Sequence, residues 1–488
     1  MNEQYFIIVL ELVFIYILYT LNKDKYSNNH NNNNSNNSNN SNNNNNSNNN
    51  NNIITNIVPM INKISHGKLN NGLKYIINNT KCGDKITVML FVKVGSRDET
   101  PKLNGMSHVL EHMMFQGTDK YPSSQKLHEA IDKYGAIFNA YTSLDITCYY
   151  ITIYTKYIDY ALSILSDLYF NSLILDKHLQ KEKTVVINEI KKNNSNPKRV
   201  IQEDIVSNIM KTTPMSKKIA GTDKNVKSFQ VDDLMSFLNY YYNPNKVILS
   251  IGGYISNPSK LIKNIHDLFG INKTYPSKKK LNYTRELFPN FYKRKTHSQI
   301  NYLKKKLDTN YITIGFPAYK LNSKNSYVLD VISTILAGYM SSRLYLKLRN
   351  ELGIIYNISN NIDALEDCGY YFLMCGTHDV DNCVGAILEE LNKIKDELVL
   401  EDEINRAKDY INGQQQMSKN DSNVLATHYG INYLYFGKII TIEESLKQIN
   451  NVTPKDIQRV AKLTFKKSKL KLHYMGSKSH NLKNTLTD

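Results

Sequence analysis

The strongest constraint on the fold is an order of strand and helix patterns that occurs twice. In the first half the patterns are a strand, a helix, a short apolar segment and a long helix, at Cys148–Ile153, Tyr157–Leu168, Leu173–Asp176 and the stretch that follows. In the second half the same order occupies Cys368–Leu373, Asp381–Leu391, Leu398–Glu401 and the stretch that follows. The offset is close to 225 residues, which is far longer than the repeat of a solenoid. We therefore expect two homologous lobes.

Each lobe combines apolar, alternating strand patterns with long helix patterns. Further strand patterns lie at Ile86–Val94, Val247–Ile251 and Tyr311–Gly315. Such strands next to long helices indicate the α+β class, with a mainly antiparallel sheet in each lobe and helices packed on it. We predict a first lobe at residues 53–272, a Lys-rich connection at 273–306 and a second lobe at 307–478.

The amino-terminal segment is apolar between residues 5 and 21 and is interrupted only by Glu11. At 17 residues it meets the lower limit for a membrane-spanning helix. A signal peptide would need a small-residue cleavage site, and a mitochondrial presequence would be rich in Arg and poor in residues such as Glu3 and Asp24. We predict that residues 1–26 contain a single-pass membrane anchor.

Residues 27–52 are almost entirely Asn and Ser, which gives them no apolar surface to bury, so we expect a disordered linker. The chain has five cysteines, an odd number, and no Cys-x-x-Cys pair. This favours a reducing compartment for the folded part over a secreted disulfide-bonded one.

The formal net charge of +17 raises the question of an anionic partner. However, the lysines are scattered in short runs such as Lys278–Lys280 and Lys304–Lys306. No recognition motif for nucleic acid accompanies them. We interpret these lysines as solvated surface charge and expect no nucleic-acid partner.

The segment 105–117 carries the sequence His-x-x-Glu-His between apolar neighbours. Ser107 is a plausible N-cap and Gly117 can end the helix. On a helix, His108 and His112 are four residues apart and share a face, so both imidazoles can reach one metal ion. Glu111 lies beside that face and is well placed to take a proton from a water molecule at the metal. This order inverts the His-Glu-x-x-His sequence of zinc peptidases.

A catalytic zinc site needs a third protein ligand and one open position. Two candidates, Glu182 and Glu189, lie seven residues apart on the helix pattern that begins near residue 179. One of them can bind the metal while the other orients an imidazole. The spacing does not choose between them, and either residue alone would be read as a solvated helix charge.

The motifs resemble those of the pitrilysin/insulinase family of zinc peptidases, over about residues 64–471. Similarity is greatest to the branch that contains the mitochondrial processing peptidase beta subunit and its bacterial relatives. Three blocks carry the resemblance in order, namely Gly95–Glu99, His108–Thr118 and Phe138–Ser143. The family's third ligand follows the second histidine at the separation found between His112 and Glu189, which is 77 residues.

The resemblance implies one Zn²⁺ per chain, held by His108, His112 and Glu189, with Glu111 as general base and Glu182 as a supporting carboxylate. It also implies that an edge strand pairs with the substrate backbone through Asn139, Ala140, Tyr141 and Thr142.

In the family, an Arg and a Tyr seven residues later reach from the second lobe towards the scissile bond. Arg349 and Tyr356 fit that pattern. An Arg can hold a substrate carbonyl, and a Tyr hydroxyl can stabilise an oxyanion. The alternative interpretation is a surface Arg and a packing Tyr.

The second lobe lacks the histidine motif. At the offset of 225 residues, Gln414 stands for Glu189 and Ala407 for Glu182. We therefore expect a catalytic first lobe and a non-catalytic second lobe that forms a wall of the chamber, as the resemblance implies. The Gly-rich loop of the processing peptidase alpha subunit is missing from the sequence.

The function that we predict is hydrolysis of peptide bonds in extended peptides or unfolded polypeptide segments by a zinc metalloendopeptidase. Because family members enclose substrate between two pairs of lobes, a homodimer or heterodimer is expected. The alternatives are a non-catalytic core-type subunit of a membrane complex, a mitochondrial presequence-processing subunit, and a membrane-tethered protein with a structural metal. The predicted location is membrane-associated, with a mitochondrial location as the alternative.

Overall fold

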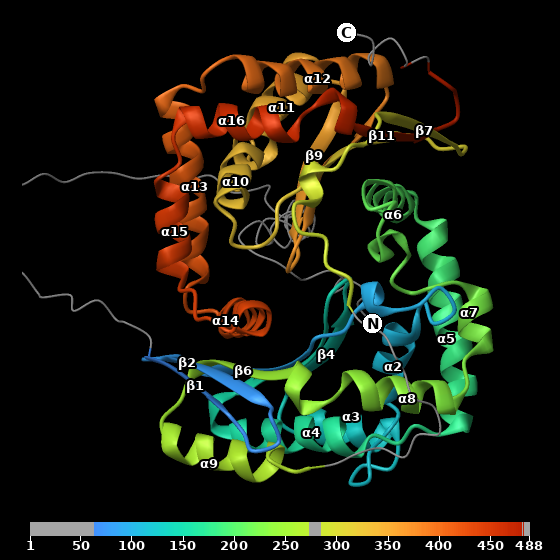
Figure 1. The fold of residues 1–488 in the computed structure, drawn as a ribbon, viewed down its shortest axis with the longest axis vertical. Coiled ribbons are helices and arrows are strands. Elements are labelled where there is room, and N and C mark those ends of the chain that lie inside the picture. Colours follow the sequence, from blue (N-terminus) through green and yellow to red (C-terminus); the bar gives the residue numbers. More distant parts are fainter. Residues whose placement is uncertain (1–62, 273–284, 481, 483–488) are drawn as a thin grey trace, which may run out of the picture.

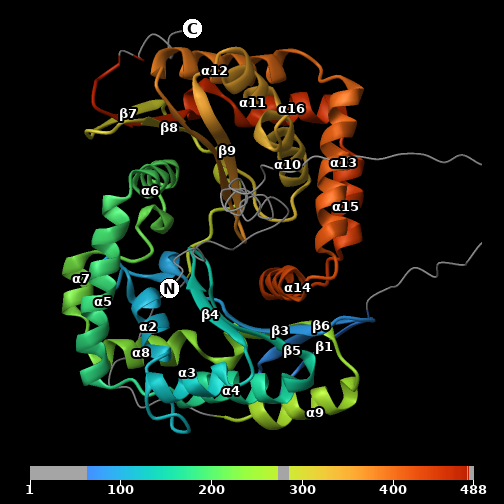
Figure 2. The ribbon, with the colours of Figure 1, turned by 180° about the vertical axis from the view of Figure 1, so that it is seen from behind.

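The computed structural model describes residues 63–272, 285–480 and 482. It shows two lobes that face each other, each built on one sheet whose outer side is covered by helices (Figures 1 and 2). The strand order is β1-β2-β6-β3-β5-β4 in the first sheet and β7-β11-β8-β10-β9 in the second. The pairs β2–β6 and β7–β11 are parallel and the other pairs are antiparallel. The predicted α+β class is confirmed.

The strands of the first sheet are β1 Lys63–Lys68, β2 Lys74–Thr80, β3 Lys85–Val92, β4 Ile137–Thr142, β5 Thr147–Tyr154 and β6 Val247–Tyr254. The strands of the second sheet are β7 Gln299–Lys304, β8 Asn310–Ala318, β9 Ile355–Ala364, β10 Gly369–Thr377 and β11 Lys471–Gly476. Strand β7 thus comes from the segment that we interpreted as a connection, and it pairs with β11.

The helices between the strands of the first half are α2 Met106–Met114, α3 Ser124–Asp132, α4 Ile158–Asn171, α5 Asp176–Ser195, α6 Pro197–Ile209, α7 Asp223–Ser228, α8 Val231–Tyr241 and α9 Pro258–Phe269. Those of the second half are α10 Lys324–Ala337, α11 Arg343–Tyr345, α12 Val380–Asp396, α13 Glu401–Ser418, α14 Ser422–Phe436, α15 Ile442–Asn450 and α16 Pro454–Thr464. The order β5-α4-α5-α6 is repeated as β10-α12-α13-α14, which is the duplication seen in the sequence.

Each half contributes one helix to the sheet of the other half. Helix α6 packs on β8, β10 and β11 of the second sheet, and α14 packs on β2, β3 and β6 of the first (Figure 1). Two hydroxyl contacts fix α14 in place: Thr87 Oγ1 lies 2.9 Å from Ser422 Oγ, and Ser250 Oγ donates to the carbonyl of Ala426 at 2.6 Å. This exchange joins the two lobes through buried surface.

The exchange depends on a glycine at the contact between β6 and α14. A Cβ added at Gly252 would lie 2.5 Å from the carbonyl oxygen of Ser422 and 2.7 Å from the amide nitrogen of Ala426. Both are backbone atoms of α14, so the helix would have to move.

We therefore expect Gly252→Ala to lower the free energy of unfolding by about 1–3 kcal/mol. Urea unfolding followed by circular dichroism measures this change. Gly385→Ala is the matched control, because Gly385 is an exposed glycine of α12 with open space around it. Equal stabilities of the two variants would contradict this packing of α14 on β6.

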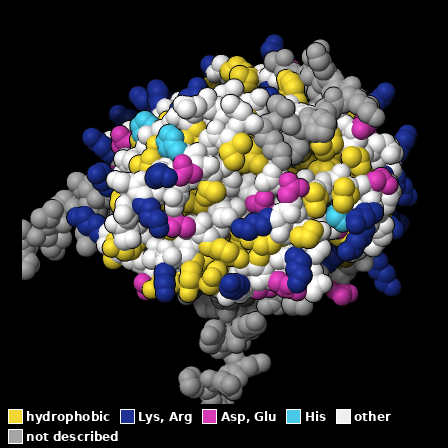
Figure 3. Space-filling model, turned by 90° about the horizontal axis from the view of Figure 1, so that it is seen from below, with side chains coloured by type: hydrophobic (Ala, Val, Ile, Leu, Met, Phe, Trp, Pro, Cys, Tyr) yellow, Lys and Arg dark blue, Asp and Glu magenta, His cyan; other side chains and the backbone are white. Residues whose placement is uncertain are grey.

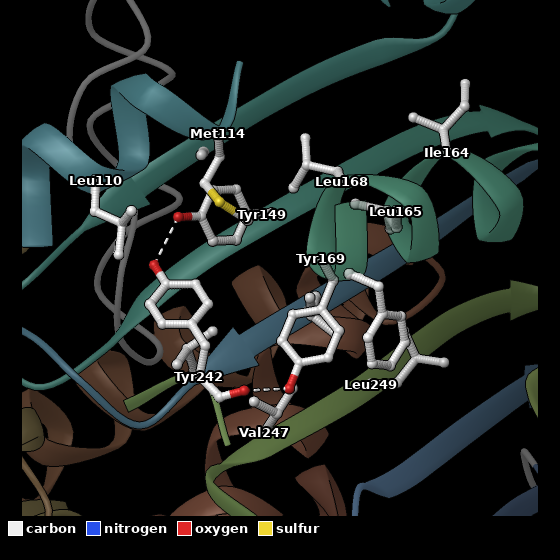
Figure 4. Packing of buried hydrophobic residues seen from close by; sticks show 14 of the residues in the cluster. Leu110, Met114, Tyr149, Ile164, Leu165, Leu168, Tyr169, Tyr242, Val247 and Leu249 are labelled. Atoms are coloured by element: carbon white, nitrogen blue, oxygen red, sulfur yellow. Dashed lines mark hydrogen bonds between the residues drawn. The ribbon is translucent and has the colours of Figure 1, made fainter. Parts of the chain in front are cut away.

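One side of helix α2 packs on the hydrophobic core of the first lobe. Leu110 and Met114 of α2 pack on this core together with Tyr149 of β5 (Figure 4). Two Tyr side chains bond to Tyr242: the hydroxyl of Tyr149 lies 2.7 Å from its hydroxyl, and Tyr169 donates to its carbonyl at 2.5 Å. Because residues two positions apart on a helix point to nearly opposite sides, the burial of these apolar side chains turns the histidine face of α2 away from the core.

A buried ion-pair network also joins the lobes. The Arg97 guanidinium lies 2.8 Å from Asp145 of the first lobe and 2.8 Å from Asp367 of the second. Arg285 bridges Asp98, at 2.6 Å, and Glu366, at 3.1 Å. Arg97 is only 2 % exposed, so its charge is compensated by carboxylates and not by water.

The predicted membrane location must be corrected. Within residues 63–272, 285–480 and 482, no helix combines the length and the apolar composition needed to cross a membrane. The two longest described helices, α5 and α13, carry charged side chains along their length. The predicted anchor at residues 5–21 and the linker at 27–52 lie outside the described residues.

The surface charge of the first lobe is mixed. On the face seen in Figure 3, Lys and Arg side chains are interspersed with Asp, Glu and small hydrophobic patches. The lysines on this face therefore do not form one continuous basic surface.

Candidate functional site

Helix α2 does not begin where its sequence pattern predicts. Its N-cap is Gly105, at φ +100°, and not Ser107, which lies inside the helix. The buried carboxylate of Glu99 accepts hydrogen bonds from the backbone N–H groups of Gly105 and Ser107, both at 2.7 Å. A carboxylate at a helix N-terminus is favoured by the helix dipole, and this one replaces the side-chain cap. The helix ends at Met114, and Gly117, at φ +135°, lies in the turn beyond it.

Helices α2 and α5 bring three metal-binding groups together. The Nε2 atoms of His108 and His112 each lie 3.6 Å from Oε2 of Glu189, and the three ligand atoms are all within 4.8 Å of one another. A separation of 3.6 Å is too long for a hydrogen bond. It is close to the spacing of about 3.4 Å between neighbouring ligands of a tetrahedral ion with bonds of about 2.1 Å. This geometry fits a metal ion.

The electrostatics of the cluster also favour a cation. Burial lowers the pKa of His108 to about 4, so its imidazole is neutral. Burial opposes the charge of His112 as well, but the carboxylates of Glu182 and Glu189 outweigh it and raise the His112 pKa to about 10. Burial would raise the pKa of Glu189, yet the two imidazoles lower it to about 2. The cluster therefore stabilises positive charge beside Glu189, which a divalent ion would supply.

The two candidate carboxylates of α5 lie on different sides of His112. Glu189 faces Nε2, whereas Oε2 of Glu182 lies 3.1 Å from Nδ1. The other oxygen of Glu182 accepts a hydrogen bond from Nε2 of Gln116 at 2.9 Å. Glu182 is thus placed to hold the imidazole so that Nε2 points at Glu189. The role of Gln116 was not anticipated, because nothing in its spacing indicates it.

We predict that Glu182→Gln lowers the affinity of the site for zinc about 10–100-fold, because His112 loses the charged acceptor that orients it. Competition with a zinc-binding dye measures the affinity. Asp176→Asn, at the exposed start of the same helix, is the control and should leave the affinity unchanged. An unchanged zinc affinity in Glu182→Gln would show that Glu182 does not orient His112 for metal binding.

Glu111 lies between the cluster and strand β4. Its side chain is 5 % exposed, and its Oε2 accepts a hydrogen bond from Thr142 Oγ1 at 2.5 Å. Burial raises the pKa of Glu111 to about 7, although His112 and the hydroxyl of Thr142 oppose this shift. Thr142 was predicted only as part of the substrate strand, and its bond to Glu111 is a second contact.

Strand β4, which carries Asn139, Ala140, Tyr141 and Thr142, is an edge strand of the first sheet. Among the described strands it pairs with β5 alone. The N–H of Ala140 donates to the side chain of Asn139 at 2.8 Å. An amide at the open edge of a strand can bond to an added strand once such a side-chain bond is released.

A cavity of about 260 Å³ lies between the lobes. His108 and Glu189 line one part of it, and the end of β4 and the second half of β9 line other parts. Helix α6 and the segment 215–220 complete the wall. Because β4 lies at one edge of the first sheet and β9 at one edge of the second, the cavity is bordered by edge strands from both lobes.

Arg349 and Tyr356 are not brought to this cavity. Arg349 lies in a π-helix, Leu346–Glu351, and its guanidinium donates to the carbonyl of Tyr356 at 2.6 Å and stacks 4.5 Å from the ring. Tyr356 is 76 % exposed, and neither residue lines the cavity that contains His108. Their predicted contact with substrate stays a prediction.

Comparison with known proteins gives matches along most of the chain. Residues 74–223 match the family described as "Insulinase (Peptidase family M16)", and residues 228–411 match "Peptidase M16 inactive domain". An uncharacterized zinc protease of Rickettsia bellii is 30 % identical over 82 % of this chain and 95 % of its own length. The "Probable mitochondrial-processing peptidase subunit beta" of Arabidopsis thaliana is 24 % identical over 80 % of this chain and 74 % of its own length.

Among solved structures, a protease from Helicobacter pylori superposes with a TM-score of 0.78. It is 20 % identical and covers 85 % of this chain and 99 % of its own. At this identity the likeness concerns the fold, and it confirms the two-lobed architecture.

Proposed function

Because the chain belongs to the insulinase family of peptidases, peptidase family M16, we propose that it is a zinc-dependent endopeptidase acting on extended polypeptide segments. The observation that carries the proposal is the convergence of His108, His112 and Glu189 beside the buried carboxylate of Glu111. Two imidazoles and one carboxylate are a donor set of catalytic zinc sites, in which a fourth position stays open.

Zinc, when bound by these three residues, supplies a Lewis acid that activates water and polarises a carbonyl oxygen. Glu111 takes a proton at its carboxylate and returns it to the leaving amine. Burial raises the pKa of Glu111, and a carboxyl group with a raised pKa is suited to taking up a proton and returning it. Thr142 holds one carboxylate oxygen in place through its hydroxyl.

Substrate lies along β4 in this proposal. An extended segment adds to the open edge of the strand through backbone hydrogen bonds. The side chain of Asn139 first has to release the N–H of Ala140, because the two are bonded in this structure. The substrate then enters the cavity, whose wall includes His108 and Glu189.

The second lobe acts as a wall of this cavity and not as a second catalytic lobe. Strands β9 and β10 supply its lining, and Ala407 and Gln414 occupy the positions equivalent to Glu182 and Glu189. A second chain, identical or different, completes the chamber as a dimer. Light scattering of the purified chain measures its molecular mass in solution, and a homodimer should have twice the mass of one chain.

The experiment that tests the function uses a quenched fluorescent peptide library. We expect the purified protein to cleave library peptides. A zinc chelator should remove at least about 90 % of this activity, because it removes the Lewis acid. Activity should recover when Zn²⁺ is added. Zinc binding without any cleavage would instead favour the core-type subunit. Cleavage that resists chelation would contradict the proposal.

A further inference from the structure

One carboxylate oxygen at the cavity between the lobes has no hydrogen-bond partner among the described residues. Asp363 lies near the end of β9, and its Oδ2 accepts a hydrogen bond from the hydroxyl of Tyr370 of β10 at 2.7 Å. Its Oδ1 is buried from solvent and makes no hydrogen bond to any described residue. Asp363 and Tyr370 both line the cavity. A buried acceptor without a donor is costly, so such an atom indicates a missing partner.

The other charged groups of the cavity wall are already satisfied. Glu203 is paired with Arg199 at 2.9 Å and with Lys218 at 3.1 Å. Lys217 donates to the carbonyl of Glu99 at 2.9 Å, and Glu189 faces the two histidines. No Lys or Arg among the described residues forms an ion pair with Asp363. Among the carboxylates of the cavity wall, Asp363 is thus the one that has no cationic partner in the described part of the chain.

The surroundings of Asp363 fit a long basic side chain. Val206, Met215 and Phe372 line the same cavity and offer apolar surface to a methylene stem. Tyr141 also lines the cavity, and its hydroxyl makes no hydrogen bond to any described residue, so it can accept an N–H donor. Burial raises the pKa of Asp363 to about 7, which a cation in contact with the carboxylate would reverse.

We propose that Asp363 is a specificity-determining residue that receives a Lys or Arg side chain of the polypeptide substrate at its Oδ1 atom. This inference rests on the proposed peptidase function and adds the class of segment selected. Because Asp363 belongs to the second lobe and the histidines to the first, a bound segment contacts both lobes. The lobe without metal ligands therefore contributes to substrate choice.

The test is a binding measurement that does not depend on turnover. A set of ten-residue fluorescent peptides on a Ser/Ala background carries one Arg, moved through every position, and a matched set carries citrulline in its place. Citrulline keeps the shape of Arg and removes the charge. Fluorescence anisotropy gives the Kd for the full chain carrying Glu111→Gln, with and without Asp363→Asn. Asp402→Asn, an exposed residue of α13, is the matched control.

We expect at least one Arg peptide to bind at least about tenfold tighter than its citrulline partner, because a buried carboxylate gains a charged donor. Asp363→Asn should abolish this ratio, and Asp402→Asn should preserve it. Equal binding of the two sets, binding of neither set, or a ratio that persists in Asp363→Asn would overturn the proposal.

Cleavage of the same peptides by the wild-type chain separates this inference from the proposed function. If binding distinguishes Arg from citrulline through Asp363 but no peptide is cleaved, the proposed subsite is supported and the proposed peptidase function is not. Cleavage with equal kcat/KM for Arg and citrulline keeps the peptidase and removes the subsite.

Discussion

Glu111→Gln will lower the rate of peptide hydrolysis by at least about 10²–10⁴-fold, which is the contribution of a positioned general base. The amide has nearly the shape of the carboxylate, and it can still bond to Thr142, but it cannot take a proton. Because Glu111 is not one of the three residues whose ligand atoms converge, the variant should keep its zinc. The measurement is kcat/KM on a cleaved library peptide, together with zinc content.

The matched control for this variant is Thr142→Val, which removes the hydroxyl and leaves the carboxylate. We expect a smaller loss of rate than in Glu111→Gln. Because the hydrogen bond from Thr142 lowers the pKa of Glu111, its loss should raise this pKa and move the acid side of the pH profile to higher pH. Full activity in Glu111→Gln would show that another group transfers the proton.

Arg97→Met will lower the stability of the fold more than Gly252→Ala does. It leaves Asp145 and Asp367 buried without their shared cation, and such a loss costs about 3–5 kcal/mol. Because Asp367 belongs to the second lobe and Asp145 to the first, the change also weakens the joint between the lobes. Thermal unfolding followed by circular dichroism should show a marked decrease in Tm.

Arg459→Met serves as the comparison, because Arg459 forms an exposed ion pair with Asp456 on α16. Exposed pairs contribute about 0–1 kcal/mol, so this variant should unfold close to the wild type. If both variants lose the same stability, the buried network does not hold the lobes together.

Local patterns were enough to predict much of the fold. The apolar runs predicted at Ile86–Val94 and Val247–Ile251 correspond to β3 and β6, because strands buried on a sheet must be apolar over their length. The duplication was visible because both halves keep the same order of elements. What the patterns could not show is the exchange of α6 and α14, since periodicity marks an apolar face and not the sheet that covers it.

The candidate metal ligands were predictable for a similar reason. The spacing of His108 and His112 fixes their common face on any helix. The choice between Glu182 and Glu189 needed the family resemblance, because both residues lie on one side of α5. The structure separates them by placing Glu182 at Nδ1 and Glu189 at Nε2 of His112.

The partners supplied by distant segments were beyond the sequence. Glu99 caps α2 from a preceding loop, and no capping pattern marks it. Asp363 reaches the cavity only because two lobes more than 200 residues apart in the chain face each other. Such contacts depend on the tertiary arrangement and leave no local periodicity.

The most direct test of the metal site is the zinc content of the purified protein, measured by mass spectrometry of the metal beside that of Glu189→Gln and His108→Phe. We predict about one zinc per chain in the wild type, since the described residues contain one such donor set. Both variants should have at least a tenfold lower zinc content at equal folding. A wild type without zinc, or variants that keep it, would contradict the assignment of His108, His112 and Glu189 as the metal site.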